Sequence, residues 1–302
     1  MTRNASLKAH AALLGANLIY GANYSLAKEV VPFWIGPSGM ILIRVSGAVL
    51  LFGLLWLLKP EWPRREDTTR FLICAATGVA INQLMFFEGL SLTSPIQASI
   101  ILTANPVLVL LAAALIAREA ITLRKAIGIA LGIFGALVLV MQRDATPSGT
   151  NVALGNIFIL VNALSYSLYL VLVRKLMAKY RVITVMTWVF IPGLLMVAPF
   201  GIGQFDQVNW QAMPDYVLQL VAFIVIGTTF LAYLLNAYAL VSVSASVVSA
   251  YVYTQPFIAS IIALALGKDQ LHPSLLIAAG LVFAGVYLVS STPSKSTEKS
   301  QN

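Results

Sequence analysis

Long apolar stretches alternate with short polar segments along the whole chain. Each stretch is long enough to cross a bilayer as a helix, which takes about 20 residues. We predict ten such spans, at residues 10–31, 38–58, 70–90, 96–117, 125–141, 153–173, 182–202, 216–240, 245–266 and 274–290. Strands with alternating polar and apolar positions do not recur, so a barrel is excluded. The pattern therefore predicts an all-α integral membrane protein.

The composition supports this interpretation. Hydrophobic residues fill 59% of the 302 positions and charged residues only 10%, whereas soluble domains carry about 25% charged residues. A water-soluble globule is therefore excluded. The last segment, residues 292–302, is rich in Ser, Lys and Glu, and we expect a disordered cytoplasmic tail there.

The basic residues fall mainly on one side of the predicted membrane. With the N-terminus inside, fifteen of the nineteen Lys and Arg lie in inner segments, three in outer segments, and Arg44 within a span. Short loops with this bias are cytoplasmic. The net charge of +8 therefore reflects topology, and a nucleic-acid partner is excluded. We expect a multi-pass protein of the cell inner (plasma) membrane with both termini in the cytoplasm.

Few residues offer reactive chemistry. The one cysteine, Cys74, excludes an internal disulfide, and His10 and His272 are too few for a metal site. Ser25 and Lys28 match an S-x-x-K nucleophile pattern, but the K-T-G and S-D-N elements that accompany it are missing. No P-loop and no H-E-x-x-H occurs. We expect no enzyme, no cofactor and no ATP-driven pumping.

The chain contains an internal repeat. Residues 94–140 align without a gap on residues 244–290, at an offset of 150. Identical pairs in this frame include Ser99 with Ser249, Pro106 with Pro256, Leu131 with Leu281, and Gly135 with Gly285. We divide the chain into one repeat at 10–141 and a second at 153–290. Each holds five spans, an odd number, so the second enters the membrane in the opposite sense, as in inverted-repeat transporters.

Polar side chains follow one face of several predicted spans. Asn17, Tyr20 and Tyr24 recur at helical spacing in the first span, and similar stripes occupy the sixth and eighth. Polar groups at membrane depth face protein or water. Interhelical hydrogen bonding is the alternative for each residue alone, but stripes on repeat-related spans favour a central cavity. Its candidate lining residues are Asn17, Tyr20, Tyr24, Gln83, Phe86, Thr103, Asn105, Asn162, Tyr166, Tyr169, Tyr233, Asn236, Tyr253 and Gln255.

Two prolines, Pro106 and Pro256, occupy equivalent places near the middle of their spans. Each removes a backbone donor and displaces the carbonyl four residues earlier, at Leu102 or Val252. A static kink is the alternative for either proline alone. Because the two are related by the repeat, we interpret them as hinges.

Three ionisable residues cluster on the predicted outer side. Arg44 lies two turns inside its span, roughly 10 Å deep by helical rise, while Lys28 and Glu88 lie at the outer ends of theirs. A charge at that depth needs a partner or water. We predict a gate or ion network in which Arg44 pairs with Glu88 or a backbone carbonyl. Such a network serves either as an extracellular gate or coupling site or as a fixed structural clamp, and the clamp is favoured.

The segment Phe87–Pro95, FEGLSLTSP, with Asn105-Pro106 and Arg118-Glu119 after it, resembles the EamA repeat of the drug/metabolite transporter superfamily. Residues 237–269 resemble a second copy, and Tyr20 stands where that repeat often has Trp. The resemblance covers the chain from residue 10 to 290. It implies ten transmembrane helices in two inverted five-helix repeats around a central cavity. Helices one, three and four and their counterparts six, eight and nine would form that cavity.

These features predict a secondary transporter that exports a small organic metabolite by alternating access. Neutral, zwitterionic or aromatic compounds fit the lining better than polyanions, which need several Lys or Arg. Amino acids are the first choice, partly because the family that the chain resembles includes amino-acid exporters. The alternatives are an uptake carrier, a channel and a non-transporting membrane scaffold. The expected partners are a small-molecule substrate and the lipid bilayer. A proton or another coupling ion, and a monomer or a homodimer, are left open.

Overall fold

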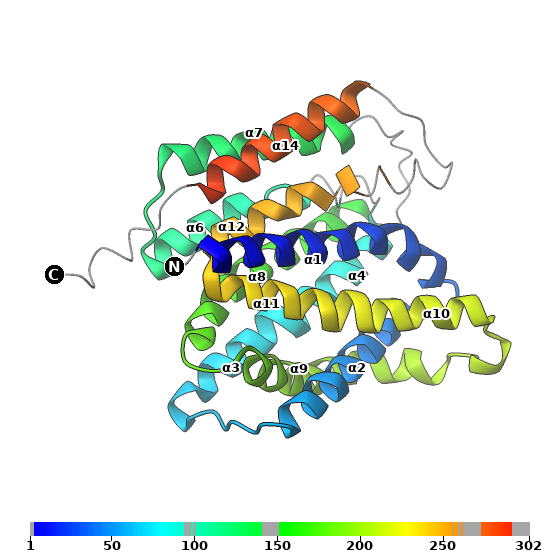
Figure 1. The fold of residues 1–302 in the computed structure, drawn as a ribbon. Helices are drawn as coiled ribbons and strands as arrows, with labels where there is room; N and C mark the ends of the chain where they lie inside the picture. The colour runs from blue at the N-terminus through cyan, green and yellow to red at the C-terminus, as the bar shows by residue number, and fades with distance from the viewer. Residues whose placement is uncertain are drawn as a thin grey trace.

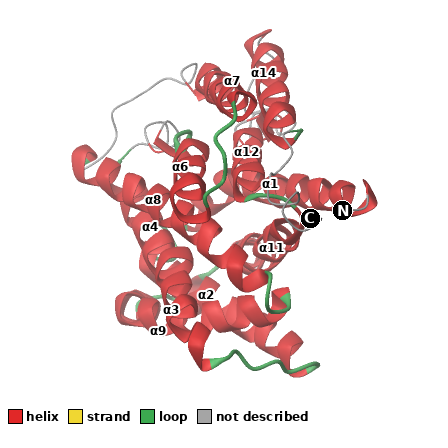
Figure 2. Ribbon diagram, turned by 90° about the vertical axis from the view of Figure 1, so that its left-hand side faces the viewer, coloured by secondary structure: helices red, strands yellow, loops and turns green. Residues whose placement is uncertain are grey.

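The computed structural model describes residues 3–93, 98, 101–140, 151–255, 257–258, 261 and 273–291. All regular structure in this part of the chain is helical (Figures 1 and 2). The α-helices are α1 (Arg3–Val30), α2 (Pro37–Leu57), α3 (Thr68–Ala75), α4 (Ile81–Leu92), α6 (Asn105–Ala117), α7 (Leu123–Val140), α8 (Val152–Met177), α9 (Val182–Asp206), α10 (Asp215–Phe223), α11 (Ala232–Ser242), α12 (Ala245–Ala250) and α14 (Pro273–Ser290). Shorter turns are η1 (Arg65–Asp67), η3 (Trp210–Ala212) and η5 (Tyr251–Tyr253), with π-helical η2 (Ala76–Ala80) and η4 (Ile224–Leu231). The predicted tail at 292–302 lies outside the described residues.

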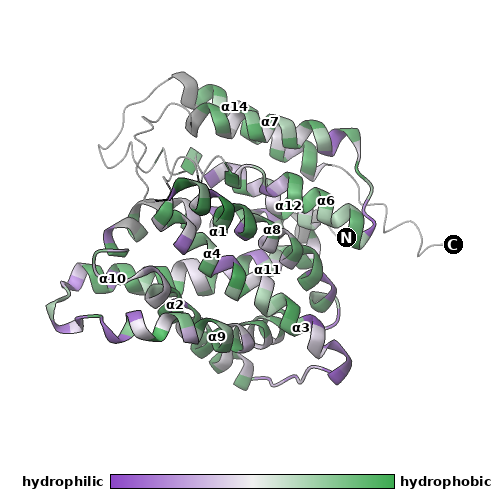
Figure 3. Cartoon of the chain, turned by 180° about the vertical axis from the view of Figure 1, so that it is seen from behind, coloured by the Kyte–Doolittle hydropathy of each residue, from purple (hydrophilic) through white to green (hydrophobic). Residues whose placement is uncertain are grey.

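Five helical stretches are long and apolar enough to cross a membrane: Pro37–Leu57, Arg65–Leu92, Val152–Met177, Val182–Asp206 and Asp215–Ser242. Two are composite, because α3, η2 and α4 run on as one helix and α10, η4 and α11 do the same. Hydrophobic residues, green in Figure 3, make up most of the outer helices. Many of them face outward: Leu115 and Leu195 are 82% and 72% exposed. Lipid suits such apolar surfaces better than water. A multi-pass helical membrane protein is thus confirmed, whereas ten spans stays a prediction.

Helices of the first predicted repeat pack on helices of the second. α1 contacts α11, α2 contacts α9, α4 contacts α8, and α7 contacts α14. The α7–α14 pair lies at one side of the bundle and α2 with α9 at the opposite side (Figures 1 and 2). The main core cluster between them contains Phe52, Val109 and Phe190, all fully buried. Such cross-pairing is expected of two inverted halves.

Glycines bring backbone against backbone at two of these contacts. A Cβ built on Gly128 of α7 would lie 2.7 Å from the Gly285 carbonyl oxygen of α14. Where α4 crosses α8, a Cβ on Gly89 would lie 3.0 Å from the Gly155 carbonyl, and a Cβ on Gly155 would lie 2.9 Å from the Gly89 carbonyl. Larger side chains at these points would push the helices apart.

The two composite helices carry π-helical turns at equivalent positions. Shifted by the repeat offset of 150, η2 falls on residues 226–230, inside η4. In η4 the Thr229 hydroxyl also donates to the Ile224 carbonyl at 3.0 Å. A π turn inserts one residue into the helical register and is frequent at functional sites. The repeat therefore extends to a local irregularity of the backbone.

A carboxylate-centred ion cluster joins two loops on the predicted cytoplasmic side. The Asp67 carboxylate, only 3% exposed, accepts hydrogen bonds from Lys179 Nζ at 3.0 Å, from the Tyr180 hydroxyl at 2.8 Å and from Arg70 at 3.4 Å. Asp67 precedes the apolar part of its helix, which begins after Arg70. The Tyr180 hydrogen bond, assisted by Lys179, lowers the pKa of the Asp67 carboxyl despite its burial. The cluster therefore ties the start of α3 to the segment after α8.

Glu119 is the centre of a second cluster on the same side. Its carboxylate accepts from Lys125 Nζ at 3.2 Å and from Arg174 of α8 at 3.0 Å. Arg118 ends α6 in the left-handed conformation, with φ 53°, so the chain turns directly into this cluster. The end of α8 is thus tied to both the η1 turn and the α6–α7 loop.

Candidate functional site

A cavity of about 150 Å³ lies inside the bundle. Side chains of α1, α2, α4, α6, α8 and α11 form its wall, together with residues near positions 102 and 252. The lining residues are Tyr20, Asn23, Arg44, Asn82, Gln83, Phe86, Phe87, Leu102, Asn105, Asn162, Tyr166, Tyr233, Val252 and Gln255. A protein cavity of about this volume holds a molecule of the size of benzene. The space suits one small ligand.

The predicted cavity residues fall into three groups. Those that line the cavity are Tyr20, Gln83, Phe86, Asn105, Asn162, Tyr166, Tyr233 and Gln255. Tyr169 and Asn236 line a smaller neighbouring space. Asn17, Thr103 and Tyr253 are buried behind the wall. The side chain of Tyr24 lies outside those that the structure describes.

Asn23, Asn82 and Phe87 also line the cavity, although the sequence did not single them out for it. Asn23 follows Tyr20 by three positions and therefore shares its helix face. Asn82 is the second residue after the π-helical turn η2, which shifts the register of the polar face. The sequence signal that could have identified Asn82 is the pair of adjacent polar residues, Asn82 and Gln83, at membrane depth.

Several lining residues are related by the repeat. The pairs at an offset of 150 are Gln83 with Tyr233, Leu102 with Val252, and Asn105 with Gln255. The cavity therefore draws equivalent positions from both halves of the chain. Sites at such an interface are typical of inverted-repeat carriers.

The fourth predicted span is interrupted at the cavity. α6 begins at Asn105, which places Pro106 in its first turn, where a missing N–H forfeits no helical hydrogen bond. Just before it, the Ala104 N–H donates to the Ile101 carbonyl at 3.0 Å in a tighter turn. Pro106 therefore lies in the first turn of a helix, whereas the sequence placed it near the middle of a span, and its role as a hinge stays a prediction. Pro256 lies outside the described residues.

Among the described residues that line the cavity, Arg44 is the only one with a formal charge. Its side chain is buried, its Nε donates to Thr229 Oγ1 at 2.8 Å, and its guanidinium carbon lies 5.2 Å from the centre of the Phe87 ring. The negative face of an aromatic ring stabilises a cation at this distance. The partner of Arg44 is thus the Thr229 hydroxyl, and the predicted pairing with Glu88 or a carbonyl is wrong.

Glu88 has a different partner. Its Oε1 accepts a hydrogen bond from Ser38 Oγ at 2.6 Å, which ties α4 to the first turn of α2. The Lys28 side chain lies outside those that the structure describes. In place of one network, the described residues hold two separate contacts, Arg44 with Thr229 and Glu88 with Ser38.

Several polar atoms of the wall have no hydrogen-bond partner in the part of the chain that the structure describes. They are Asn23 Oδ1, Asn105 Oδ1 and both ends of the Gln83 amide. A buried polar group left unpaired costs about 1–3 kcal/mol. The cavity is large enough for water or a ligand to reach these atoms. Among the described residues, no group of three or more His, Cys, Asp or Glu is placed to hold a metal ion.

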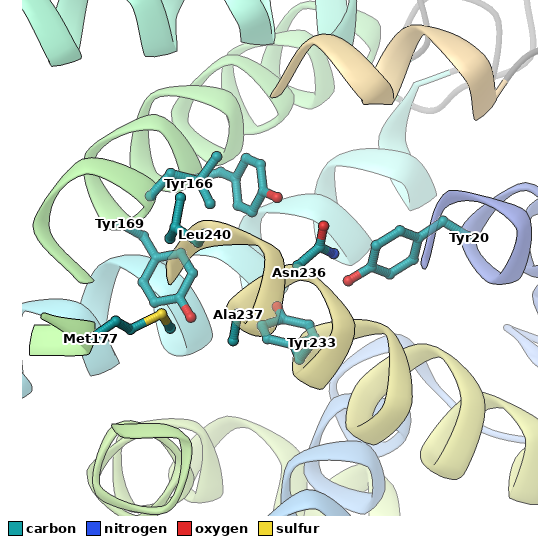
Figure 4. A pocket seen from close by; sticks show the side chains of 9 residues that line it. Tyr20, Tyr166, Tyr169, Met177, Tyr233, Asn236, Ala237 and Leu240 are labelled. Atoms are coloured by element: carbon teal, nitrogen blue, oxygen red, sulfur yellow. The ribbon is translucent and has the colours of Figure 1, made fainter. Parts of the chain in front are cut away.

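Tyr166, Tyr169 and Tyr233 form a tyrosine layer, which lies between the cavity and the C-terminal end of α8. These residues and Asn236 surround a space of only about 10 Å³, close to the smallest that holds one water. Tyr20 of α1 faces the α8 tyrosines across Asn236 and Tyr233 of α11 (Figure 4). The Tyr233 hydroxyl donates to the carbonyl of residue 78 in η2 at 3.3 Å. The layer therefore narrows the interior to a constriction.

Two hydrogen bonds at or behind the wall join separate helical segments, and a third lies within α1. Gln255 Nε2 donates to Asn17 Oδ1 at 2.8 Å, and Asn17 Nδ2 donates to the Leu13 carbonyl at 2.8 Å. The Tyr253 hydroxyl donates to the Thr103 carbonyl at 3.1 Å. These contacts follow the alternative interpretation of the polar stripes, in which hydrogen bonds between helices stabilise the bundle.

Comparisons with known proteins connect the chain to transport. The sequence model of the EamA-like transporter family matches residues 7–141 and 153–291. The chain is 25% identical over 284 residues to the uncharacterized transporter YyaM of Bacillus subtilis (strain 168), with 92% of each chain covered. It is also 25% identical over 284 residues to the S-adenosylmethionine/S-adenosylhomocysteine transporter of Chlamydia muridarum (strain MoPn / Nigg), covering 90% of this chain and 88% of that one. A solved structure titled "Crystal structure of protein" shares the fold, with a TM-score of 0.73, 17% identity, and coverage of 96% and 98%.

Proposed function

The chain belongs to the EamA-like transporter family, and we propose that it is a secondary carrier that exports a small organic metabolite by alternating access. In this proposal, two inverted halves at residues 10–141 and 153–290 move around the central cavity. The protein lies in the cell inner membrane with both termini in the cytoplasm. An uptake carrier is the second candidate, because a carrier driven by gradients can transport its substrate in either direction.

The observation that carries the proposal is the polar cavity at the interrupted fourth span. Secondary transporters bind substrates near the bilayer midplane, between their repeats, where helices are discontinuous. Here the break before Asn105 opens onto the cavity, and Gln255 stands opposite at the equivalent position. Dry internal cavities are apolar, whereas this wall holds unpaired carboxamide atoms. Those unmet hydrogen bonds support a ligand site.

In this proposal the described constrictions lie between the cavity and the cytoplasm. With the N-terminus inside, Arg44 and the cavity lie towards the outer end of α2, and the tyrosine layer lies on their cytoplasmic side. The ion clusters of Asp67 and Glu119 follow further inward. Export then requires the tyrosine layer to open and these clusters to separate, while the outer ends of the helices close over the substrate.

The wall chemistry defines the substrate class. Carboxamides, tyrosines and phenylalanines dominate, with one cation. Polyanions such as sugar phosphates need several cationic partners, so a neutral or zwitterionic compound fits better. We put amino acids and their derivatives first. In support, one relative is named for S-adenosylmethionine and S-adenosylhomocysteine, which both contain an α-amino acid group.

Counterflow with the purified protein in proteoliposomes tests this function. Vesicles preloaded with a mixture of the twenty standard amino acids are diluted into a trace of each one in labelled form. Saturable uptake of label that depends on the preload supports a carrier. Flux that does not saturate indicates a channel, and no flux with any amino acid overturns the proposed substrate class. Release of the same compound by intact cells that overproduce the protein, compared with uptake, separates export from import.

A further inference from the structure

We infer that Arg44 binds the carboxylate of the transported compound, and that the compound carries an amino group as well, as an α-amino acid does. The inference rests on the proposed carrier function and assigns the substrate contacts within it. It follows from three features of the cavity wall: its single cation, a helix N-terminus, and carboxamide oxygens without partners.

The guanidinium of Arg44 lacks an anionic partner among the described residues. A buried charge is costly unless an opposite charge or several hydrogen bonds match it. The described salt bridges do not include Arg44, and the carboxylate that the sequence suggested, Glu88, is held by Ser38. Of the five N–H donors of arginine, the described contacts use Nε alone, on Thr229. A carboxylate from the ligand supplies the missing charge.

The contacts of Arg44 orient its side chain for this task. The bond from Nε to Thr229 and the packing against Phe87 fix the plane of the guanidinium. Its terminal nitrogens form a planar fork, which matches a carboxylate with two parallel hydrogen bonds. Because Arg44 lines the cavity, that fork is presented to the ligand space.

The start of α6 adds positive potential to the same cavity. A helix N-terminus carries a partial positive charge and unpaired N–H groups. α6 is 13 residues long and begins at Asn105, which lines the cavity, is 6% exposed and has an unpaired Oδ1. Interrupted helices of transporters direct such ends at anionic substrate groups.

The rest of the wall suits an ammonium group and a side chain of moderate size. Asn23 Oδ1, Asn105 Oδ1 and the Gln83 carbonyl oxygen are unpaired acceptors, and an ammonium group has three donors to give. No Asp or Glu is among the described residues that line the cavity, so a ligand cation without a carboxylate would be repelled by the charge of Arg44. Phe86 and Tyr166 supply apolar contact for the side chain.

Ligand chemistry tests the inference on the unaltered protein. The thermal stability of the purified protein is measured with each of the twenty standard amino acids, since a ligand that binds the folded state raises Tm. For every amino acid that does so, its amide, its decarboxylated amine and its deaminated acid are compared. We expect the amide and the amine to lose the shift and the acid to keep part of it. An equal shift with the amide, an equal shift with chloride alone, or no shift with any amino acid overturns the inference.

Variants locate the contact. Arg44→Gln should weaken binding of the stabilising amino acid by about tenfold or more, because it removes a charge-assisted pair. Arg44→Lys should retain part of the affinity, since it keeps the charge without the fork. Thr229→Val keeps the charge and frees the guanidinium, so we expect a smaller loss. Arg124→Gln, an exposed basic residue of α7, is the matched control and should bind normally.

The amide comparison keeps the inference testable if Arg44→Gln does not fold. Normal affinity in folded Arg44→Gln overturns the inference even where the amide binds weakly, because another residue then binds the carboxylate. The proposed function fails separately. If counterflow occurs with compounds that lack a carboxylate, the carrier stands and the carboxylate site falls. If amino acids bind at Arg44 without any counterflow, the site stands and the carrier falls.

Discussion

The Tyr253 hydroxyl donates a hydrogen bond to the backbone carbonyl of Thr103, at 3.1 Å, across a sequence separation of 150 residues. That separation is the repeat offset, so each residue contacts its own counterpart in the other half. Such a contact places the pair beside the pseudo-two-fold axis that relates inverted halves. The bond therefore joins the two repeats at their common centre, next to the cavity.

Removing this bond should destabilise the protein modestly. We expect Tyr253→Phe to lower the free energy of unfolding by about 1 kcal/mol, because the buried hydrogen bond to the Thr103 carbonyl is lost. The measurement is Tm of the purified protein in detergent. Tyr238→Phe, at a tyrosine that is 45% exposed, is the control and should leave Tm unchanged. Equal effects of the two variants would contradict the role of the bond.

A methyl group at Gly78 should disturb the tyrosine layer. A Cβ there would lie 2.6 Å from Tyr169 Cγ, and a ring cannot yield as a flexible chain does. We expect Gly78→Ala to cost about 1–3 kcal/mol of stability and to slow counterflow. Gly53→Ala, which meets no atom within 4 Å, should be neutral or stabilising by up to about 1 kcal/mol. Normal flux in Gly78→Ala would show that the layer tolerates displacement.

Neutralising Asp67 should break its ion cluster with Lys179, Tyr180 and Arg70. Asp67→Asn weakens charge-assisted bonds from Lys179 and Tyr180, and we expect a loss of about 1–2 kcal/mol, because Lys179 is itself 45% exposed. The measurement is the midpoint of thermal unfolding. Glu66→Gln is the control: its carboxylate is 62% exposed, and surface pairs contribute about 0–1 kcal/mol. A larger loss in Glu66→Gln than in Asp67→Asn would reverse this assignment.

The Asp67 carboxyl also makes the stability of the protein depend on pH in a defined direction. Its pKa is lowered in the folded state, chiefly by the Tyr180 hydroxyl, so the folded protein favours the ionised form. This contribution is complete above the unfolded pKa, about 4, and is lost as pH falls through the lower folded value. The Tm advantage of the wild type over Asp67→Asn should therefore persist at neutral pH and shrink in acid. Tyr180→Phe should move that loss to higher pH, and no movement would exclude the hydroxyl as the cause.

Opening the tyrosine layer should uncouple the carrier. Tyr233→Ala would join the cavity to the small space beside Tyr169, so we expect one-way leak of substrate to rise relative to trans-stimulated exchange. Tyr233→Phe keeps the ring and loses only the hydroxyl bond to η2, and should leave the ratio near normal. The measurement is efflux from proteoliposomes with and without external substrate. An unchanged ratio in Tyr233→Ala would show that the tyrosine layer is not the barrier to the substrate.

The helical fold was predictable because lipid allows few alternatives. A backbone in hydrocarbon must satisfy its own hydrogen bonds, so a long apolar run forms a helix. The span predicted at 38–58 accordingly appears as Pro37–Leu57, and that at 153–173 as Val152–Met177. The π turns and the start of α6 at Asn105 were not predictable. Their backbone depends on tertiary contacts, which hydrophobicity along the sequence does not record.

The cavity was predictable in part for a similar reason. Polar residues at membrane depth, such as Asn162 and Tyr166, face the protein interior because exposure to lipid is unfavourable. The partner of Arg44 was not predictable, because it depends on where one long side chain points. Thr229 lies in a π-helical turn whose altered register brings its hydroxyl to Arg44 Nε, while Glu88 lies within reach of Ser38 instead.

The glycine contacts of α7 with α14 and of α4 with α8 constrain how the halves can move. At Gly128 and Gly285, and again at Gly89 and Gly155, no layer of side chains separates the backbones. Pulling such surfaces apart would forfeit close-packed contacts without anything to fill the gap. Sliding along them keeps the contacts, as in shear motions of packed helices. If the halves move as proposed, we expect these four helices to slide along their contact surfaces while the helix ends open and close elsewhere.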